Sequence, residues 1–161
     1  MKGTSSFPSY SFNFNKFSFG PRIIQDNDFC FNETNLTFTN MDTEPIMIEK
    51  VSQIHPDFTI DFKSQMVPPR SSVDIKAEFY PKEVKNYNAT FEFLVNGVYK
   101  EKVKLSGMGE DLQVCLKNLA DGIVNFIDIP IGTEVSKKIV LYNKSNAITK
   151  FILYSVRGVE V

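Results

Sequence analysis

The chain has 161 residues, of which 42% are apolar, 13% aromatic and 23% charged, and its formal net charge is -1. This length suits one to two domains with a buried core, and an ordinary apolar content with almost no net charge excludes a disordered chain. The lack of a basic excess argues against nonspecific nucleic-acid binding. No apolar run reaches the roughly 18 to 20 residues needed to cross a bilayer.

Alternating apolar residues, which are typical of half-buried β-strands, run through the sequence from its start. Tyr10, Phe12 and Phe14 alternate with polar residues, and Phe17 and Phe19 do so after a slip of one residue. Such a slip predicts a bulge or a strand that changes partners. Further alternating sets are Phe29 with Phe31, Leu36 with Phe38, Phe58 with Ile60 and Phe62, and every second residue from Val73 to Phe79.

A β-hairpin is predicted next. Apolar residues at every second position from Tyr87 to Val95 lead into Asn96-Gly97, a pair that favours a type I′ turn, and the chain returns through residues 98–105. Turn residues also fill 42–45 and 66–72. No helical apolar period extends over ten residues. The sequence therefore predicts an all-β chain whose short strands form a sandwich.

The first unit ends at residues 105–109, and a second beginning follows. Residues 124–126 resemble 17–19, and residues 139–143 resemble 36–40, at an offset of a little over 100 residues in both cases. Because this is the size of one sandwich domain, we expect an N-terminal tail over 1–10, a complete sandwich over 11–110 and the first strands of a second, truncated one over 111–161. We therefore expect the chain to be a piece of a longer tandem array.

Candidate catalytic residues are few. His55 and Asp57 could act as a base and its orienting carboxylate, but no nucleophile motif accompanies them and Pro56 favours a solvent-facing turn. Clusters with metal-ligand spacing and glycine-rich phosphate loops do not occur. We therefore predict no enzyme and assign no catalytic, cofactor-binding or metal-binding residue and no cofactor.

Two sets of side chains are candidates for binding. Lys100, Lys102 and Lys104 alternate along the return strand, either as a basic stripe for an acidic peptide or as the solvated side of a strand. The early phenylalanines form either a platform on which bases stack or, as an uncharged all-β chain favours, part of the core; they are Phe12, Phe14, Phe17 and Phe19.

The cysteines and the glycosylation sequons bear on the compartment. Cys30 and Cys115 could form one disulfide, but two buried thiols in a reducing cytosol fit better, because no signal-peptide apolar stretch follows Met1. Four sequons favour an extracellular adhesion-type sandwich if they are used; they begin at Asn32, Asn35, Asn88 and Asn143.

An ordered set of short motifs spans the first unit: Phe19-Gly20, residues 36–40 with Pro45-Ile46, residues 56–60, the turn at 68–72, residues 73–81, 87–90 and 95–97, and the glycine-containing end at 105–109. This set resembles the ASH domains of Hydin-like ciliary proteins, which are relatives of the major sperm protein and PapD-like immunoglobulin sandwiches. The resemblance covers residues 11–110 in full and 111–161 as the front of another copy, where Phe126-Ile127 replaces Phe-Gly.

The resemblance implies a scaffold and no active site. Its members look like structural modules of cilia and centrosomes that bind proteins in tandem. The chain is then expected in the cytoplasm and cytoskeleton, at the axoneme of a cilium or flagellum, in a central-apparatus scaffold. Expected partners are axonemal, centrosomal or microtubule-associated proteins, with no nucleic acid, direct membrane contact or small-molecule substrate. The alternative is a major-sperm-protein-like adaptor that binds acidic peptide motifs at membranes.

Overall fold

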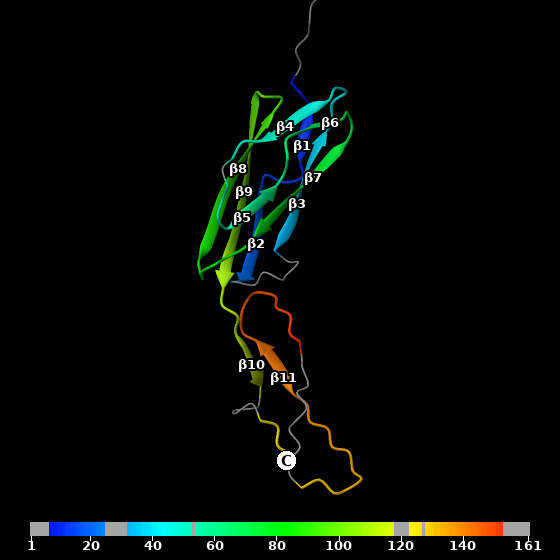
Figure 1. Ribbon diagram of the computed structural model, residues 1–161, viewed down its shortest axis with the longest axis vertical. Coiled ribbons are helices and arrows are strands. Elements are labelled where there is room, and N and C mark those ends of the chain that lie inside the picture. The colour runs from blue at the N-terminus through cyan, green and yellow to red at the C-terminus, as the bar shows by residue number, and fades with distance from the viewer. Residues whose placement is uncertain (1–6, 25–31, 53, 118–122, 127, 153–161) are drawn as a thin grey trace, which may run out of the picture.

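A computed structural model describes residues 7–24, 32–52, 54–117, 123–126 and 128–152 (Figure 1). Over these ranges the regular structure consists of strands, and no helix in them is long and apolar enough to cross a membrane. The strands are β1 (Tyr10–Phe12), β2 (Lys16–Ile23), β3 (Glu33–Asn40), β4 (Ile46–Lys50), β5 (Phe58–Asp61), β6 (Gln65–Val67), β7 (Ser72–Phe79), β8 (Asn86–Val95), β9 (Tyr99–Glu110), β10 (Val114–Lys117) and β11 (Val140–Asn143).

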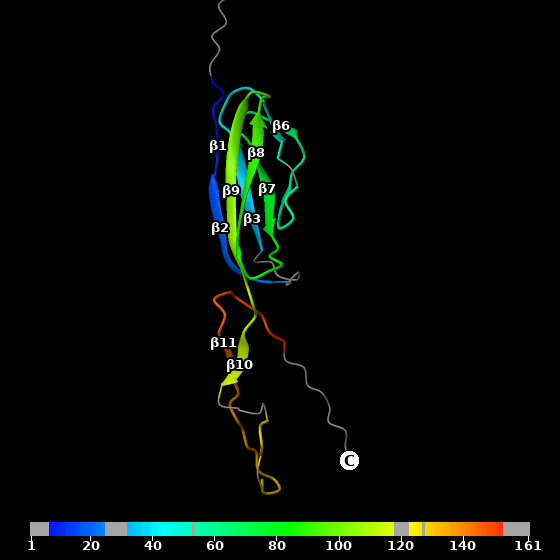
Figure 2. The same ribbon diagram turned by 90° about the vertical axis from the view of Figure 1, so that its left-hand side faces the viewer.

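Strands β1 to β9 build a sandwich of two sheets, and the β10–β11 pair lies beyond one end of it (Figure 2). One sheet has the order β1-β3-β7-β5 and the other the order β2-β9-β8-β4-β6. Strand β2 runs parallel to β9, while the remaining pairings are antiparallel. The predicted all-β, immunoglobulin-like sandwich is confirmed.

The slip between the early phenylalanines marks a change of sheet. Strand β1 pairs with β3, and the Asn13 side chain closes this pairing by donating to the Asn35 carbonyl (3.1 Å) and accepting the Thr37 N–H (2.9 Å). Two residues later the Asn15 carbonyl accepts the Lys104 N–H (2.9 Å), and β2 continues alongside β9 in the other sheet. Of the two predicted explanations, the change of partner is the correct one.

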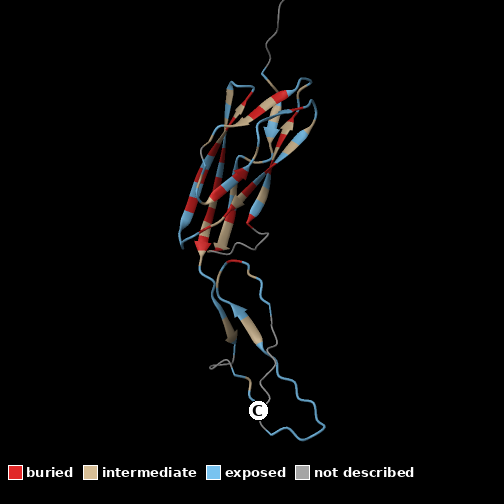
Figure 3. Ribbon diagram, in the orientation of Figure 1, coloured by how far each residue is buried: buried red, intermediate tan, exposed pale blue. Residues whose placement is uncertain are grey.

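The core lies between the two sheets, where most of the inward-facing residues of β2 to β9 are buried (Figure 3). The rings of Phe58 and Phe79 stack with centroids 4.6 Å apart at 20°, and both side chains are fully buried. Phe19 belongs to this core, and the other three early phenylalanines pack against it. These rings therefore belong to the core, as the sequence favours, and they do not form the alternative base-stacking platform.

Two predicted turns differ in outcome. Asn96 and Gly97 have φ values of 50° and 68°, as a type I′ turn requires, although strand pairing resumes only at Tyr99 opposite Val95. The turn expected over 66–72 begins later, at Pro68. Its first two residues belong to β6 and pair with β4, because the Val67 side chain is buried opposite Ile46 in the core.

The second unit contains one antiparallel pair over the described residues, in which Val114 to Lys117 of β10 face Asn143 to Val140 of β11. Residues 139–143 thus lie largely in a strand, as their likeness to 36–40 suggests. Residues 124–126 do not lie in a strand, although the similar residues 17–19 lie in β2. The first strand of this unit is instead β10, which the similarity between the two units in sequence did not indicate.

Candidate interaction surfaces

The lysine stripe lies on the outer face of the five-stranded sheet. In β9, Val103 and Leu105 point into the core, so the lysines at 100, 102 and 104 point outward and are exposed. Strand β2 adds a fourth lysine, because Lys16 lies directly beside Lys104 in the parallel pairing. The sequence did not reveal this neighbour, since Lys16 and Lys104 are far apart along the chain.

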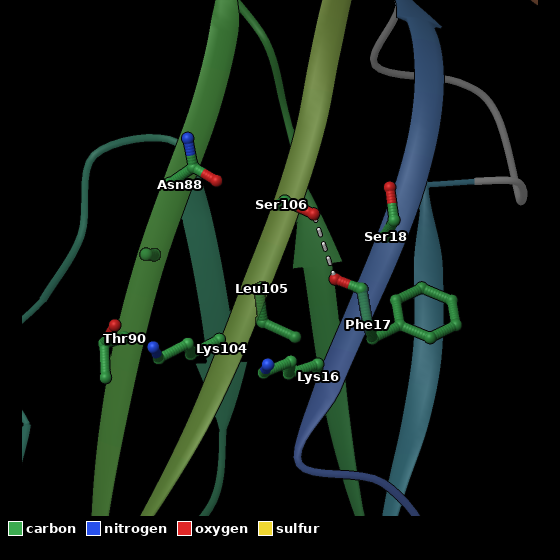
Figure 4. A pocket seen from close by; sticks show the side chains of 9 residues that line it. Lys16, Phe17, Ser18, Asn88, Thr90, Lys104, Leu105 and Ser106 are labelled. Atoms are coloured by element: carbon green, nitrogen blue, oxygen red, sulfur yellow. Dashed lines mark hydrogen bonds between the residues drawn. The ribbon is translucent and has the colours of Figure 1, made fainter.

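An open groove runs over this face, between β2, β9 and β8 (Figure 4). The two lysine side chains lie side by side in it and are flanked by hydroxyl and amide groups. The polar lining consists of Lys16, Ser18, Asn88, Thr90, Lys104 and Ser106. We call this surface the lysine groove. It offers ammonium, hydroxyl and amide donors and no carboxylate, which is a lining that suits an anionic group.

The charges around the lysine groove are only partly balanced. The Lys102 ammonium is 3.1 Å from the Glu92 carboxylate, on the side of the stripe away from Lys16. No carboxylate of the described residues lies within ion-pair distance of Lys16 or Lys104. Two neighbouring cations without a counter-charge repel each other, so an acidic ligand bound there would relieve that repulsion.

His55 and Asp57 make contacts with each other and with the neighbouring Phe58. The Asp57 N–H donates to His55 Nδ1 (3.2 Å), the two side chains are 4.0 Å apart, and the imidazole packs edge-on against Phe58 at 5.3 Å between centroids. The histidine is half-buried rather than solvent-facing. No group of three or more His, Cys, Asp or Glu side chains in the described part of the chain is placed to hold a metal ion.

The sequons and cysteines occupy different surroundings. Asn32 is only 4% exposed, so its side chain is not accessible to a glycan in the folded chain, whereas Asn35 and Asn88 are exposed. Cys115 is a half-buried free thiol in β10. Cys30 lies outside the described residues, so its state stays a prediction.

Sheet edges are the other surfaces on which a partner could bind. Strand β2 forms one edge of the five-stranded sheet, but its register shifts between Ser18 and Pro21, around Gly20 at φ 69°. Such an irregularity, together with a proline, obstructs the addition of a long strand. At the opposite edge, β6 has only three residues. The two edges of this sheet are thus poorly suited to extended strand pairing.

Comparison with known proteins shows to which family of domains the sandwich belongs. Residues 8–110 match the family model described as the HYDIN/CFA65/VesB-like, Ig-like domain, which is most of the chain and all of β1 to β9. The chain belongs to this family. The resemblance inferred from the short motifs is therefore confirmed.

Individual relatives agree with this assignment. The chain is 24% identical to human Hydrocephalus-inducing protein homolog over 159 residues and to mouse Hydrocephalus-inducing protein over 157 residues. These alignments cover 97% and 96% of the chain but only 3% of each relative. Among solved structures, the ASH/PapD-like domain 7 of human CEP192 matches with a TM-score of 0.56 at 12% identity, covering 70% of this chain and 94% of that domain. This last likeness shows the fold alone.

Proposed function

We propose that the chain is a non-catalytic structural and protein-interaction module of a large ciliary or flagellar scaffold protein, located at the axonemal central apparatus and needed for cilium assembly or motility. The observation that carries this proposal is the family match over residues 8–110, which coincides with the whole sandwich. The relatives are many times longer than this chain. A single unit then acts as one rigid element among many.

The sandwich provides its partners with a stiff surface. Its interior consists of interlocked aromatic and aliphatic side chains, so the outer faces keep fixed positions. The lysine groove is the surface on this module with the most distinctive chemistry, and we expect a protein partner to contact it. Its partner is an axonemal, centrosomal or microtubule-associated protein with a complementary acidic surface.

The test is localisation and rescue in multiciliated cells. The full-length parent protein, carrying a tag, should be confined to the axoneme and restore beating to cells that lack it. A version with Lys16→Glu and Lys104→Glu should lose rescue, while the charge-matched Lys63→Glu and Lys82→Glu version should keep it, because these exposed lysines lie away from the groove. Surface staining of unpermeabilised cells would defeat the proposal.

A second candidate is an adaptor for acidic peptide motifs at membranes, because the neighbouring Lys16 and Lys104 would also suit the acidic side chains of such a peptide. The chain should then bind a fluorescent, glutamate-rich peptide with an affinity that falls steeply with salt. The lysine-to-glutamate pair in the groove should abolish binding, and the Lys63, Lys82 pair should leave it unchanged. Localisation of the parent protein to the endoplasmic reticulum would select this candidate over the axonemal one.

A further inference from the structure

The β10–β11 pair repeats the register of β1 and β3. Asn40, the last residue of β3, lies opposite Tyr10 at the start of β1, and Asn143, the last residue of β11, lies opposite Val114 at the start of β10. In both pairs, the residue after the asparagine donates its N–H to the carbonyl that precedes the front strand, over 2.9 Å in the first and 2.7 Å in the second. Strand direction, register and closing hydrogen bond are thus the same.

The two asparagine side chains also make the same local bonds. In each, Oδ1 accepts the N–H two residues farther along the chain, over 2.8 Å at Asn40 and 2.9 Å at Asn143. In each, Nδ2 donates to the carbonyl four residues farther along, over 2.9 Å and 2.8 Å respectively. A shared register and a shared loop geometry identify β10–β11 as the structural counterpart of β1–β3.

The two units differ at the other edge of β3 and of its counterpart β11. Strand β3 pairs there with β7, and Asn40 Nδ2 donates to two further carbonyls, of Val67 (3.0 Å) and Pro68 (3.1 Å), in the turn before β7. Strand β11 pairs only with β10 among the described residues. The Asn143 Nδ2 group donates to the Ala147 carbonyl. Ile139, the counterpart of the fully buried Leu36, is 54% exposed.

We propose that this edge of β11 is a strand-acceptor site. Its occupant is an antiparallel segment equivalent to residues 66–80, namely a tight turn followed by a strand with apolar residues at alternate positions. The turn carbonyls would take the remaining hydrogen of the Asn143 amide. The strand would place apolar side chains opposite Leu141 and Ile139, as Val73 and Ile75 lie opposite Phe38 and Leu36.

The backbone of β11 determines which amide groups receive the strand. Lys144 donates its N–H to the Gln113 carbonyl just before β10, so by the alternation of antiparallel strands the N–H groups of Val140 and Tyr142 face β10 as well. The N–H groups of Leu141 and Asn143 face the acceptor edge. Asn40 shows the equivalent bond, because its N–H donates to the Ser71 carbonyl (2.9 Å).

The test tethers residues 66–80 of this sequence, as a probe, to the end of the complete chain through a flexible glycine–serine linker. Tethering supplies an effective concentration of the order of millimolar, so that a weak site is still filled. Amide exchange measured by NMR should slow about tenfold or more at Leu141 and Asn143 when the probe is present. At Val140 and Tyr142 the change should be smaller, because these groups already face β10.

The matched control is the same tethered probe carrying Val73→Asp and Ile75→Asp, which changes the two apolar residues that would lie opposite Leu141 and Ile139. It should leave exchange at Leu141 and Asn143 at the untethered rate. Equal protection by both probes, protection confined to the edges of the first sandwich, or no protection by either probe would each overturn the proposal. Slowing that depends on chain concentration without any probe would show a second copy on this edge and would overturn the proposed occupant.

Discussion

Asn40 is a fully buried polar residue at the end of β3, and its side chain joins three parts of the sandwich. Its amide donates to the carbonyls of Glu44, Val67 and Pro68, and its oxygen accepts the Asp42 N–H. The side chain thereby ties the loop after β3 to the turn between β6 and β7. A buried polar group of this kind stabilises the fold only while all its partners are present.

Replacing this side chain should be costly. Asn40→Ala leaves buried carbonyls without a donor, so we expect the free energy of unfolding to fall by about 2 to 4 kcal/mol. The measurement is urea denaturation of the full chain. Asn143→Ala is the matched control, because its side chain makes the same local bonds outside the sandwich. It should change the main transition by less than about 0.5 kcal/mol. Equal losses from both substitutions would contradict this account of Asn40.

Tyr10 gives the sandwich a dependence on alkaline pH. Its hydroxyl donates to the Glu101 carboxylate (2.8 Å), linking β1 to β9 across the two sheets. Burial, followed by the hydrogen bond and the negative charge of Glu101, raises the pKa of Tyr10 from 10.0 to about 12. Between these values the folded chain holds a proton that the unfolded chain has lost, so this contribution to stability is complete below pH 10 and disappears as the pH rises toward 12.

A comparison with Tyr10→Phe isolates this effect. In the wild type, a spectrophotometric titration should show a late tyrosinate step with a pKa of about 12, beyond the ordinary tyrosines and beyond Tyr80, whose pKa burial raises to a smaller extent. The Phe variant should lack that late step, and its stability should fall less between pH 10 and 12. If the late step persists in the variant, another tyrosine is responsible for it.

The β8–β9 hairpin shows how one turn fixes the position of a third strand. The Asn96 N–H donates to the Met47 carbonyl, and the Asn96 side-chain oxygen accepts the Met47 N–H, both over 2.8 Å. Asn96 and Gly97 both have positive φ. The turn therefore has two roles, which are reversing the chain and holding β4 beside it.

Substitutions in this turn should separate the two roles. Gly97→Ala meets no atom within 4 Å of its new Cβ, so its cost is the positive φ alone, about 1 kcal/mol. Asn96→Ala adds the loss of the bond to Met47 and should cost about 1 kcal/mol more. Asn96→Gly keeps the φ freedom and loses only that bond. Thermal unfolding of the three variants would measure this order, and a Gly97→Ala variant that is the least stable would refute it.

Local patterns predicted the elements in which apolar and polar residues alternate strictly. Strand β7, with Ile75, Ala77 and Phe79 buried, is the clearest case. Strands β4 and β6 were missed because Ile46-Met47-Ile48 is a continuous apolar run and β6 has only three residues before a double proline. Neither contains enough alternation to indicate a strand.

Pairings between distant segments could not be predicted in the same way. The proximity of Lys16 to Lys104 depends on the parallel β2–β9 pairing, which no local pattern encodes. For the same reason β10 went unnoticed until its hydrogen bonds could be compared with those of β1. The lysine stripe on β9 was predictable, and the lysine groove was not.

Nearly all of the buried hydrophobic side chains belong to the sandwich and very few to the second unit. The hydrophobic side chains that are buried among the described residues lie between Phe19 and Leu105, apart from Ala147 in the loop after β11 (Figure 3). Near that loop, the Glu110 carboxylate at the end of β9 accepts two hydrogen bonds from Asn146, one from its backbone N–H (3.0 Å) and one from its side chain (2.8 Å). The second unit thus adds polar contacts to the sandwich and little apolar burial.

This division predicts what truncation does. Since hydrophobic burial is the main stabilising contribution, a chain that ends at residue 110 should unfold in urea with a free energy within about 0.5 kcal/mol of that of the full chain. In the full chain, the amides of Val140 and Tyr142 should exchange at a lower opening free energy than the central amides of β8 and β9. Glu110→Ala should leave the sandwich stability nearly unchanged while speeding exchange around Asn146, because it removes the carboxylate acceptor at the joint. A truncated chain that has lost several kcal/mol would mean that the second unit contributes to the stability of the sandwich.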